Sequence, residues 1–156
     1  MPSKTSFKFA TFYIVGLVLC IALGGSMFGL VINHISEKAN EPNQSTVSLG
    51  NLISVGAAIQ SLWIAVASLV LFLIFRGLVS ISDGLVKTIF KVIGILCLLP
   101  LNIWLLVDGI LILSNMNNTN NIVMTKTIYG VSIATAVFAI ITSAMFLLGL
   151  VIGLIL

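Results

Sequence analysis

Residues 49–75 read LGNLISVGAAIQSLWIAVASLVLFLIF and contain no charged side chain. A helix rises about 1.5 Å per residue, so about 20 apolar residues span the hydrocarbon core of a bilayer. This stretch is therefore long enough to be a transmembrane helix. Similar apolar runs occupy residues 10–32, 92–113 and 128–156. Because these runs are continuous, they do not fit the strands of a β-barrel, which alternate in polarity and are only about 10 residues long.

The composition indicates the same class of protein. Charged residues make up 7% of the 156 residues and hydrophobic residues 60%, whereas about 25% of a soluble domain is charged. So few charges would not keep a water-facing surface soluble. We therefore predict an all-α, integral membrane four-helix bundle that forms a single domain. Its helices are expected at about 9–33, 49–76, 88–114 and 126–156.

Basic residues predict how the bundle is oriented. Five of them fall on one side of the membrane, namely Lys4, Lys8, Arg76, Lys87 and Lys91. Only Lys38 and Lys126 fall on the other side. The positive-inside rule then places both termini in the cytoplasm. The membrane is expected to be the plasma membrane or an endomembrane. We interpret the first run as an uncleaved helix, because it is too long for a signal peptide. The partners expected are the lipid bilayer and other membrane proteins or copies of this chain, and not nucleic acid.

The polar connections carry turn and modification signals. Residues 77–86 contain Asp83-Gly84, which favours a turn between the second and third helices. Pro100 lies inside the third helix, where its missing N–H predicts a kink. Two N-glycosylation patterns start at Asn43 and Asn117, both in the loops assigned to the outside. Asn117 is the weaker candidate, because it lies close to the membrane.

Small residues recur at helical spacing in three of the runs. They allow close approach of helices within lipid, where the hydrophobic effect does not drive association. The first helix carries Gly25 and Gly29 in a GxxxG pattern, and the third helix lacks such a stripe. The other predicted packing residues are Ser54, Ser61, Ala65 and Ser68 in the second helix, and Ala139, Ser143, Gly149 and Gly153 in the fourth. These stripes serve either packing within the bundle or contact with another subunit, and for the latter the first and fourth helices are the candidates.

Three polar residues fall within the apolar runs, and Asp108 is the most informative. It lies roughly 9 Å below the outer end of its helix, a depth at which a carboxylate is costly. It is either protonated, paired with Lys126 or His34, or exposed to a water-filled crevice. We expect a structural hydrogen bond or ion pair. Asn102 and Gln60 are expected to bridge helices, with about 0.6 to 2 kcal/mol per hydrogen bond.

No pattern in the chain indicates catalysis. There is no HExxH motif, no Ser/His/Asp set and no paired carboxylates, and His34 is the only histidine. We therefore predict a protein that is not an enzyme and has no metal ligands and no cofactor. Cys20 and Cys97 both lie in apolar runs, where the expected role of each is that of a small buried hydrophobic residue.

The layout as a whole resembles small tetraspan membrane proteins of the MARVEL-like kind. The resemblance covers the whole chain but rests on layout only: cytoplasmic termini, two short outer loops, a first helix rich in small residues over 9–32, and the acid Asp108. The Trp-Gly-Leu-Trp pattern of claudins and the Cys-Cys-Gly of tetraspanins are absent. The resemblance implies membrane organisation, vesicle traffic or junction assembly, without catalysis.

These observations favour a non-enzymatic multi-pass protein that acts through lateral helix contacts, as a membrane organiser, a scaffold or an accessory subunit of a membrane complex. The alternative is a homo-oligomeric pore or channel subunit. In that case Ser54, Ser61 and Ser68, spaced seven residues apart, would line the pore together with Gln60.

Overall fold

The computed structural model describes residues 4–38, 49–115 and 126–153. These residues form four helices and, within the described ranges, no strand. The helices are α1 (Lys4–Lys38), α2 (Leu49–Ile81), α3 (Gly84–Asn115) and α4 (Lys126–Ile152). Each helix is long and apolar enough to cross a membrane. The prediction of an all-α, four-helix membrane protein is confirmed.

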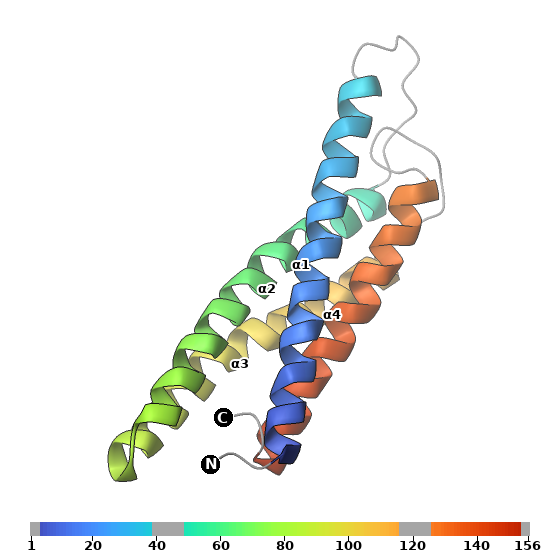
Figure 1. The fold of residues 1–156 in the computed structure, drawn as a ribbon. Coiled ribbons are helices and arrows are strands. Elements are labelled where there is room, and N and C mark those ends of the chain that lie inside the picture. Colours follow the sequence, from blue (N-terminus) through green and yellow to red (C-terminus); the bar gives the residue numbers. More distant parts are fainter. Residues whose placement is uncertain (1–3, 39–48, 116–125, 154–156) are drawn as a thin grey trace.

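The helices pack in chain order around the bundle. α1 lies between α2 and α4, and α3 completes the ring by packing against α2 and α4. The start of α1 and the end of α4 lie at the same end of the molecule (Figure 1). Towards this end the α2–α3 hairpin separates from the α1–α4 pair (Figure 1). The large apolar side chains at the tip of this hairpin are exposed, with Ile81 at 79% and Leu85 at 75%.

The connection between α2 and α3 is much shorter than the predicted turn over residues 77–86. Only Ser82 and Asp83 lie between the helices. α2 continues beyond residue 76 because the next residues remain apolar and Val79 is buried. The Ser82 N–H donates to the Val79 carbonyl at 3.4 Å. Gly84 then adopts a φ of +62°, a conformation that favours glycine, and starts α3 four residues earlier than the predicted residue 88.

α1 and the end of α3 also extend beyond their predicted bounds, whereas the start of α4 agrees with the prediction. α1 extends over Lys4–Lys38 rather than 9–33, because polar residues at a helix end continue the main-chain hydrogen bonds as well as apolar ones do. α4 begins at residue 126 as predicted, and is described as helix to Ile152. α3 continues as a helix through Pro100.

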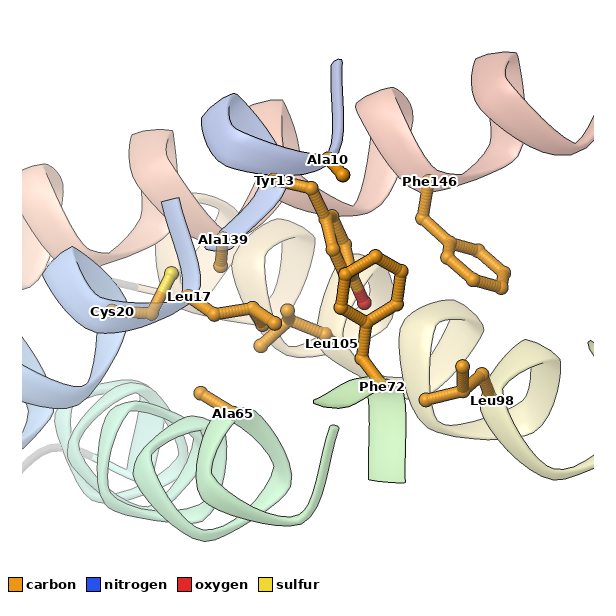
Figure 2. Packing of buried hydrophobic residues seen from close by; sticks show 10 residues of the cluster. All are labelled: Ala10, Tyr13, Leu17, Cys20, Ala65, Phe72, Leu98, Leu105, Ala139 and Phe146. Atoms are coloured by element: carbon orange, nitrogen blue, oxygen red, sulfur yellow. The ribbon is translucent and has the colours of Figure 1, made fainter. Parts of the chain in front are cut away.

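The packed core surrounds Tyr13 of α1. Its ring lies 4.8 Å from that of Phe72 and 5.7 Å from that of Phe146, measured between centroids. Leu98 and Leu105 of α3 complete the cluster, so all four helices contribute to it (Figure 2). Such interdigitated packing is the main source of helix association in lipid.

The two glycines near the hairpin tip provide a test of this turn. A Cβ added to either one would stand in open space, so Gly77→Ala and Gly84→Ala differ only in backbone conformation. We expect Gly84→Ala to lower the free energy of unfolding by about 1–2 kcal/mol, because alanine is strained at positive φ. Gly77→Ala should be neutral or stabilising, since alanine favours a helix interior. Thermal unfolding in detergent followed by circular dichroism measures both, and equal effects would contradict the turn geometry.

Candidate functional site

Buried polar side chains follow the inward sides of α2, α3 and α4. They are Asn51, Ser54, Ser61, Ser68, Asn102, Asp108, Ser132, Thr135, Thr142 and Ser143, each with no exposed surface. We call these residues the polar interior. The three α2 serines belong to it because a spacing of seven residues returns to the same face of a helix.

Asn102 joins α3 to α1 across the bundle. The Tyr13 hydroxyl donates to Asn102 Oδ1 at 2.7 Å, and the Asn102 amide donates to the Leu98 carbonyl at 2.8 Å. The prediction that Asn102 bridges helices is confirmed. Its partner was not foreseen, because a tyrosine near the start of an apolar run is typical of the aromatic belt at the membrane surface. Tyr13 instead has no exposed surface.

Most hydroxyl groups of the polar interior donate to neighbouring acceptors. Ser54 donates to the Ile112 carbonyl of α3 at 3.4 Å, and Ser61 to the Ala58 carbonyl at 2.7 Å. Thr135 and Ser143 donate to carbonyls of their own helix. The Ser132 hydroxyl donates to Met27 Sδ at 3.3 Å. The Thr142 hydroxyl lies 3.8 Å from Cys20 Sγ. The Ser68 hydroxyl, by contrast, has no hydrogen-bond partner among the described residues.

Asp108 is the one acidic residue of the polar interior. Its side chain has no exposed surface, and neither carboxylate oxygen has a hydrogen-bond partner among the described residues. Of the three alternatives that the sequence left open, a hydrogen-bonded pair with Lys126 or His34 is not formed. The expectation of a structural hydrogen bond is therefore wrong, because the Asp108 carboxyl group is fully buried in the bundle whereas Lys126 is exposed at the start of α4.

Gln60 lies on the outer surface of the bundle. It is exposed, and so is Trp63 one turn further along α2, at 63%. Gly56, one turn before, is also exposed and has open space around it. The prediction that Gln60 bridges helices within the bundle is therefore wrong: the serine stripe lies on the inward face of α2, and Gln60 lies about 100° around the helix from Ser61, outside that face.

The predicted packing residues divide into two groups. Ser54, Ser61, Ala65, Ser68, Ala139, Ser143 and Gly149 are buried in the bundle. Gly25 and Gly29 are exposed, and nothing lies within 4 Å of a Cβ at either position. Gly153 ends α4 with a φ of +75°. The predicted packing residues Ala139, Ser143 and Gly149 of α4 therefore serve the bundle, whereas the predicted glycine pair of α1 is free on its surface.

Close helix contacts use glycines that the patterns did not indicate. A Cβ on Gly24 would lie 2.7 Å from Leu62 Cβ of α2. A Cβ on Gly109 of α3 would lie 2.7 Å from Ile140 Cγ1 and 3.0 Å from the Ala136 carbonyl of α4. α3 therefore has a small-residue contact although it lacks a repeating stripe, and a single glycine gives no periodic signal.

Other predicted features are placed as follows. Cys20 is buried as expected, whereas Cys97 is exposed on α3. Within residues 4–38, 49–115 and 126–153, no three His, Cys, Asp or Glu side chains lie close enough to hold a metal ion. Asn43 and Asn117, the candidate glycosylation sites, lie outside the described residues.

Comparison with protein-family models, with curated proteins and with solved structures gives no match for this chain. What is established is the class: a multi-pass membrane protein with four helices whose apolar core also contains buried polar side chains.

The contribution of the hydrogen bond between Tyr13 and Asn102 to stability can be tested by removing the Tyr13 hydroxyl group. We expect Tyr13→Phe to lower the free energy of unfolding by about 0.6–2 kcal/mol, the range for hydrogen bonds between membrane helices. Tyr129→Phe, the same change in a half-buried side chain near the start of α4, is the control and should have little effect. Denaturant unfolding in mixed micelles compares them. A Tyr13→Phe variant as stable as the native protein would contradict this role.

The adjacent glycines of α1 provide a second matched pair. Gly24→Ala should destabilise the bundle by about 1–3 kcal/mol, the usual cost of overpacking, because the added methyl meets Leu62. Gly25→Ala points into open space and should leave the free energy of unfolding unchanged or raised. The same unfolding assay distinguishes them. If both variants behave alike, α1 does not meet α2 through Gly24.

Proposed function

We propose that this protein acts through lateral contacts with other membrane proteins or with copies of itself, as a membrane organiser, a scaffold or an accessory subunit, and not as an enzyme. The observation that carries this proposal is the position of Gln60. It lies nine residues after Asn51, where the apolar span of α2 begins, and so about 14 Å into the membrane. That is near the middle of a hydrocarbon core about 30 Å thick.

An amide at this depth favours a partner. Moving an amide from water into a medium without hydrogen-bonding groups costs about 4–8 kcal/mol, and the hydrocarbon core offers Gln60 no such group. A second helix crossing α2 here would bring a donor or acceptor to the Gln60 amide. Gly56 supports this, because its open surface allows another backbone to come close. Glutamine is both donor and acceptor, so another copy of Gln60 would also be a suitable partner.

α1 supports the same proposal with a second outward face. Gly25 and Gly29 stand on it with open space above them. The Ser26 hydroxyl between them donates to the Ala22 carbonyl at 2.9 Å, so it adds little polarity. This face has the composition of a close-packed helix contact. Lateral association therefore involves α1 and α2 on this proposal.

The alternative of a homo-oligomeric channel has less support. Ser54, Ser61 and Ser68 face the interior of their own bundle, and so they are not available to line an axis between copies. Of the side chains that were assigned to that pore, Gln60 alone is exposed. A conductive path between subunits needs polar groups through the full depth of the membrane.

The proposed topology follows from the arrangement of the helix ends. The start of α1, the end of α4 and the α2–α3 turn lie at one end of the bundle (Figure 1). Lys8, Lys87 and Lys91 belong to this end, and the positive-inside rule assigns it to the cytoplasm. The MARVEL-like layout, with its link to membrane organisation, is part of the same proposal.

The Gln60 contact can be tested by exchanging the amide for an apolar side chain. We expect the native protein to form complexes in liposomes, which crosslinking and energy transfer between labelled copies would detect. Native mass analysis would detect complexes extracted from its own membrane. Gln60→Leu should weaken association about 5- to 30-fold, corresponding to about 1–2 kcal/mol. Val70→Leu, at an exposed apolar position of α2, is the control and should not change it. A clean monomer in mild detergent and in liposomes, or equal association of all three proteins, would contradict the proposal.

A further inference from the structure

Two basic residues lie on the inward sides of α2 and α3, near the turn that joins these helices. Arg76 follows the buried Phe72 by four residues and precedes the buried Val79 by three, so it belongs to the inward stripe of α2. Lys91 precedes the buried Gly94 by three residues and belongs to the inward stripe of α3. Both basic side chains are half-buried. The hairpin therefore presents two positive charges on its inward side.

The register of the hairpin places these two charges at nearly the same level. Ser54 of α2 donates to the Ile112 carbonyl of α3, and counting along the antiparallel helices from this contact sets Arg76 opposite Phe90. The two-residue turn gives the same register to within one residue. Lys91 is one residue further on, a shift of about 1.5 Å. Packed helix axes lie about 8–10 Å apart, so two long side chains at one level can bind the same group.

Both charges lie at the depth of lipid headgroups. Arg76 is 25 residues after Asn51, where the apolar span of α2 begins, and Lys91 is 24 residues before Asn115, where α3 ends. The helical rise converts each separation to about 36–38 Å, or about 35 Å along the membrane normal at an average tilt of about 20°. The hydrocarbon core is about 30 Å thick, and headgroups extend the bilayer to about 40–45 Å. This end of the hairpin therefore reaches the layer that contains lipid phosphates.

The surroundings of the two charges favour an anion. Like charges at one level repel, and burial of a charge is costly unless an opposite charge is near. Of the described acids, Asp83 is exposed in the turn, while Asp108 and Glu37 lie towards the other end of their helices. The Arg76 guanidinium lies 6.0 Å from the centre of the Phe72 ring, which holds it beside the packed core. With five N–H donors, a guanidinium can bind an anion together with another partner.

The anion present at this depth is the phosphate group of a phospholipid. A guanidinium binds phosphate through two parallel hydrogen bonds, and an ammonium group binds it as a point charge. Two positive charges favour a lipid of net negative charge over a zwitterionic lipid, whose own cationic group they repel. We propose that Arg76 and Lys91 together bind the phosphate of one anionic phospholipid. The assignment of this lipid to the cytoplasmic leaflet rests on the proposed topology, whereas its binding does not depend on the Gln60 contact.

Native mass analysis of the full-length protein in detergent tests this site. The protein is titrated with phosphatidylglycerol, with phosphatidylcholine, and with phosphatidylglycerol in the presence of inorganic phosphate. We expect phosphatidylglycerol to bind about tenfold more tightly than phosphatidylcholine. Equimolar inorganic phosphate should not displace it, because the acyl chains also contribute to binding. Detergent-to-lipid exchange that is equal for the two lipids, or displacement of phosphatidylglycerol by equimolar phosphate, would overturn the proposal.

The two lysines of α3 provide a matched pair of variants. Arg76→Gln and Lys91→Gln should each weaken phosphatidylglycerol binding at least about tenfold, as expected for the loss of a hydrogen bond to a charged group. Lys87→Gln removes the same charge from an exposed position one turn away and should change binding less than about twofold. If Lys87→Gln and Lys91→Gln weaken binding equally, the net charge of the hairpin attracts the lipid and the proposed site is wrong.

A second measurement needs no variant and covers the case in which Arg76→Gln or Lys91→Gln does not fold. An N-hydroxysuccinimide ester acylates accessible lysine amines, and peptide mass analysis measures the modification at each position. We expect phosphatidylglycerol, compared with phosphatidylcholine, to lower the modification of Lys91 several-fold and to leave that of Lys87 nearly unchanged. Equal modification of Lys91 in the two lipids, or equal protection of both lysines, would overturn the proposal.

Discussion

Polar groups in the membrane-spanning part of this molecule must find their partners without water. The hydrocarbon core offers none, so each described apolar run forms a helix, and several internal hydroxyls donate their hydrogens to main-chain carbonyls. Ser61, Thr135 and Ser143 all donate to carbonyls of their own helix. A hydroxyl that donates to a carbonyl of its own helix has a partner whatever the position of the neighbouring helices. Such bonds allow hydroxyl side chains to be buried between helices without a partner on the facing helix.

The contacts that do join the helices are specific. Tyr13 reaches Asn102 on the opposite helix, and its ring lies against Phe72 and Phe146. Gly24 and Gly109 bring backbones close to the facing helices. Because lipid chains are as apolar as leucine, these local fits, rather than the total apolar surface, hold the four helices in one arrangement. Three of the described polar side chains remain outside this scheme: Gln60 on the surface, and Asp108 and Ser68 in the interior.

The fold was predictable because it depends on length and polarity, which a single sequence displays. Four runs of about 20 or more apolar residues leave few other architectures. Helix ends were less accessible, since the helices continue into residues such as Val79 that lack a strong stop signal. The face on which a residue lies was the least accessible. Gln60 and Asn102 are chemically alike and both lie in apolar runs, yet one is outside and the other is buried. Periodicity could assign the serine stripe of α2, which repeats, but not single residues such as Gly109 or Tyr13.

The two-residue link between α2 and α3 has a consequence for how the protein is made. Ser82 and Asp83 leave no slack between helices that pack along their length. The ribosome therefore delivers a segment whose two apolar halves meet as soon as the second half emerges. The main-chain groups of both helices must be hydrogen-bonded before they enter lipid. The buried polar side chains of α2 and α3 are best shielded from lipid when the two helices are already paired. We infer that this hairpin enters the bilayer as one unit.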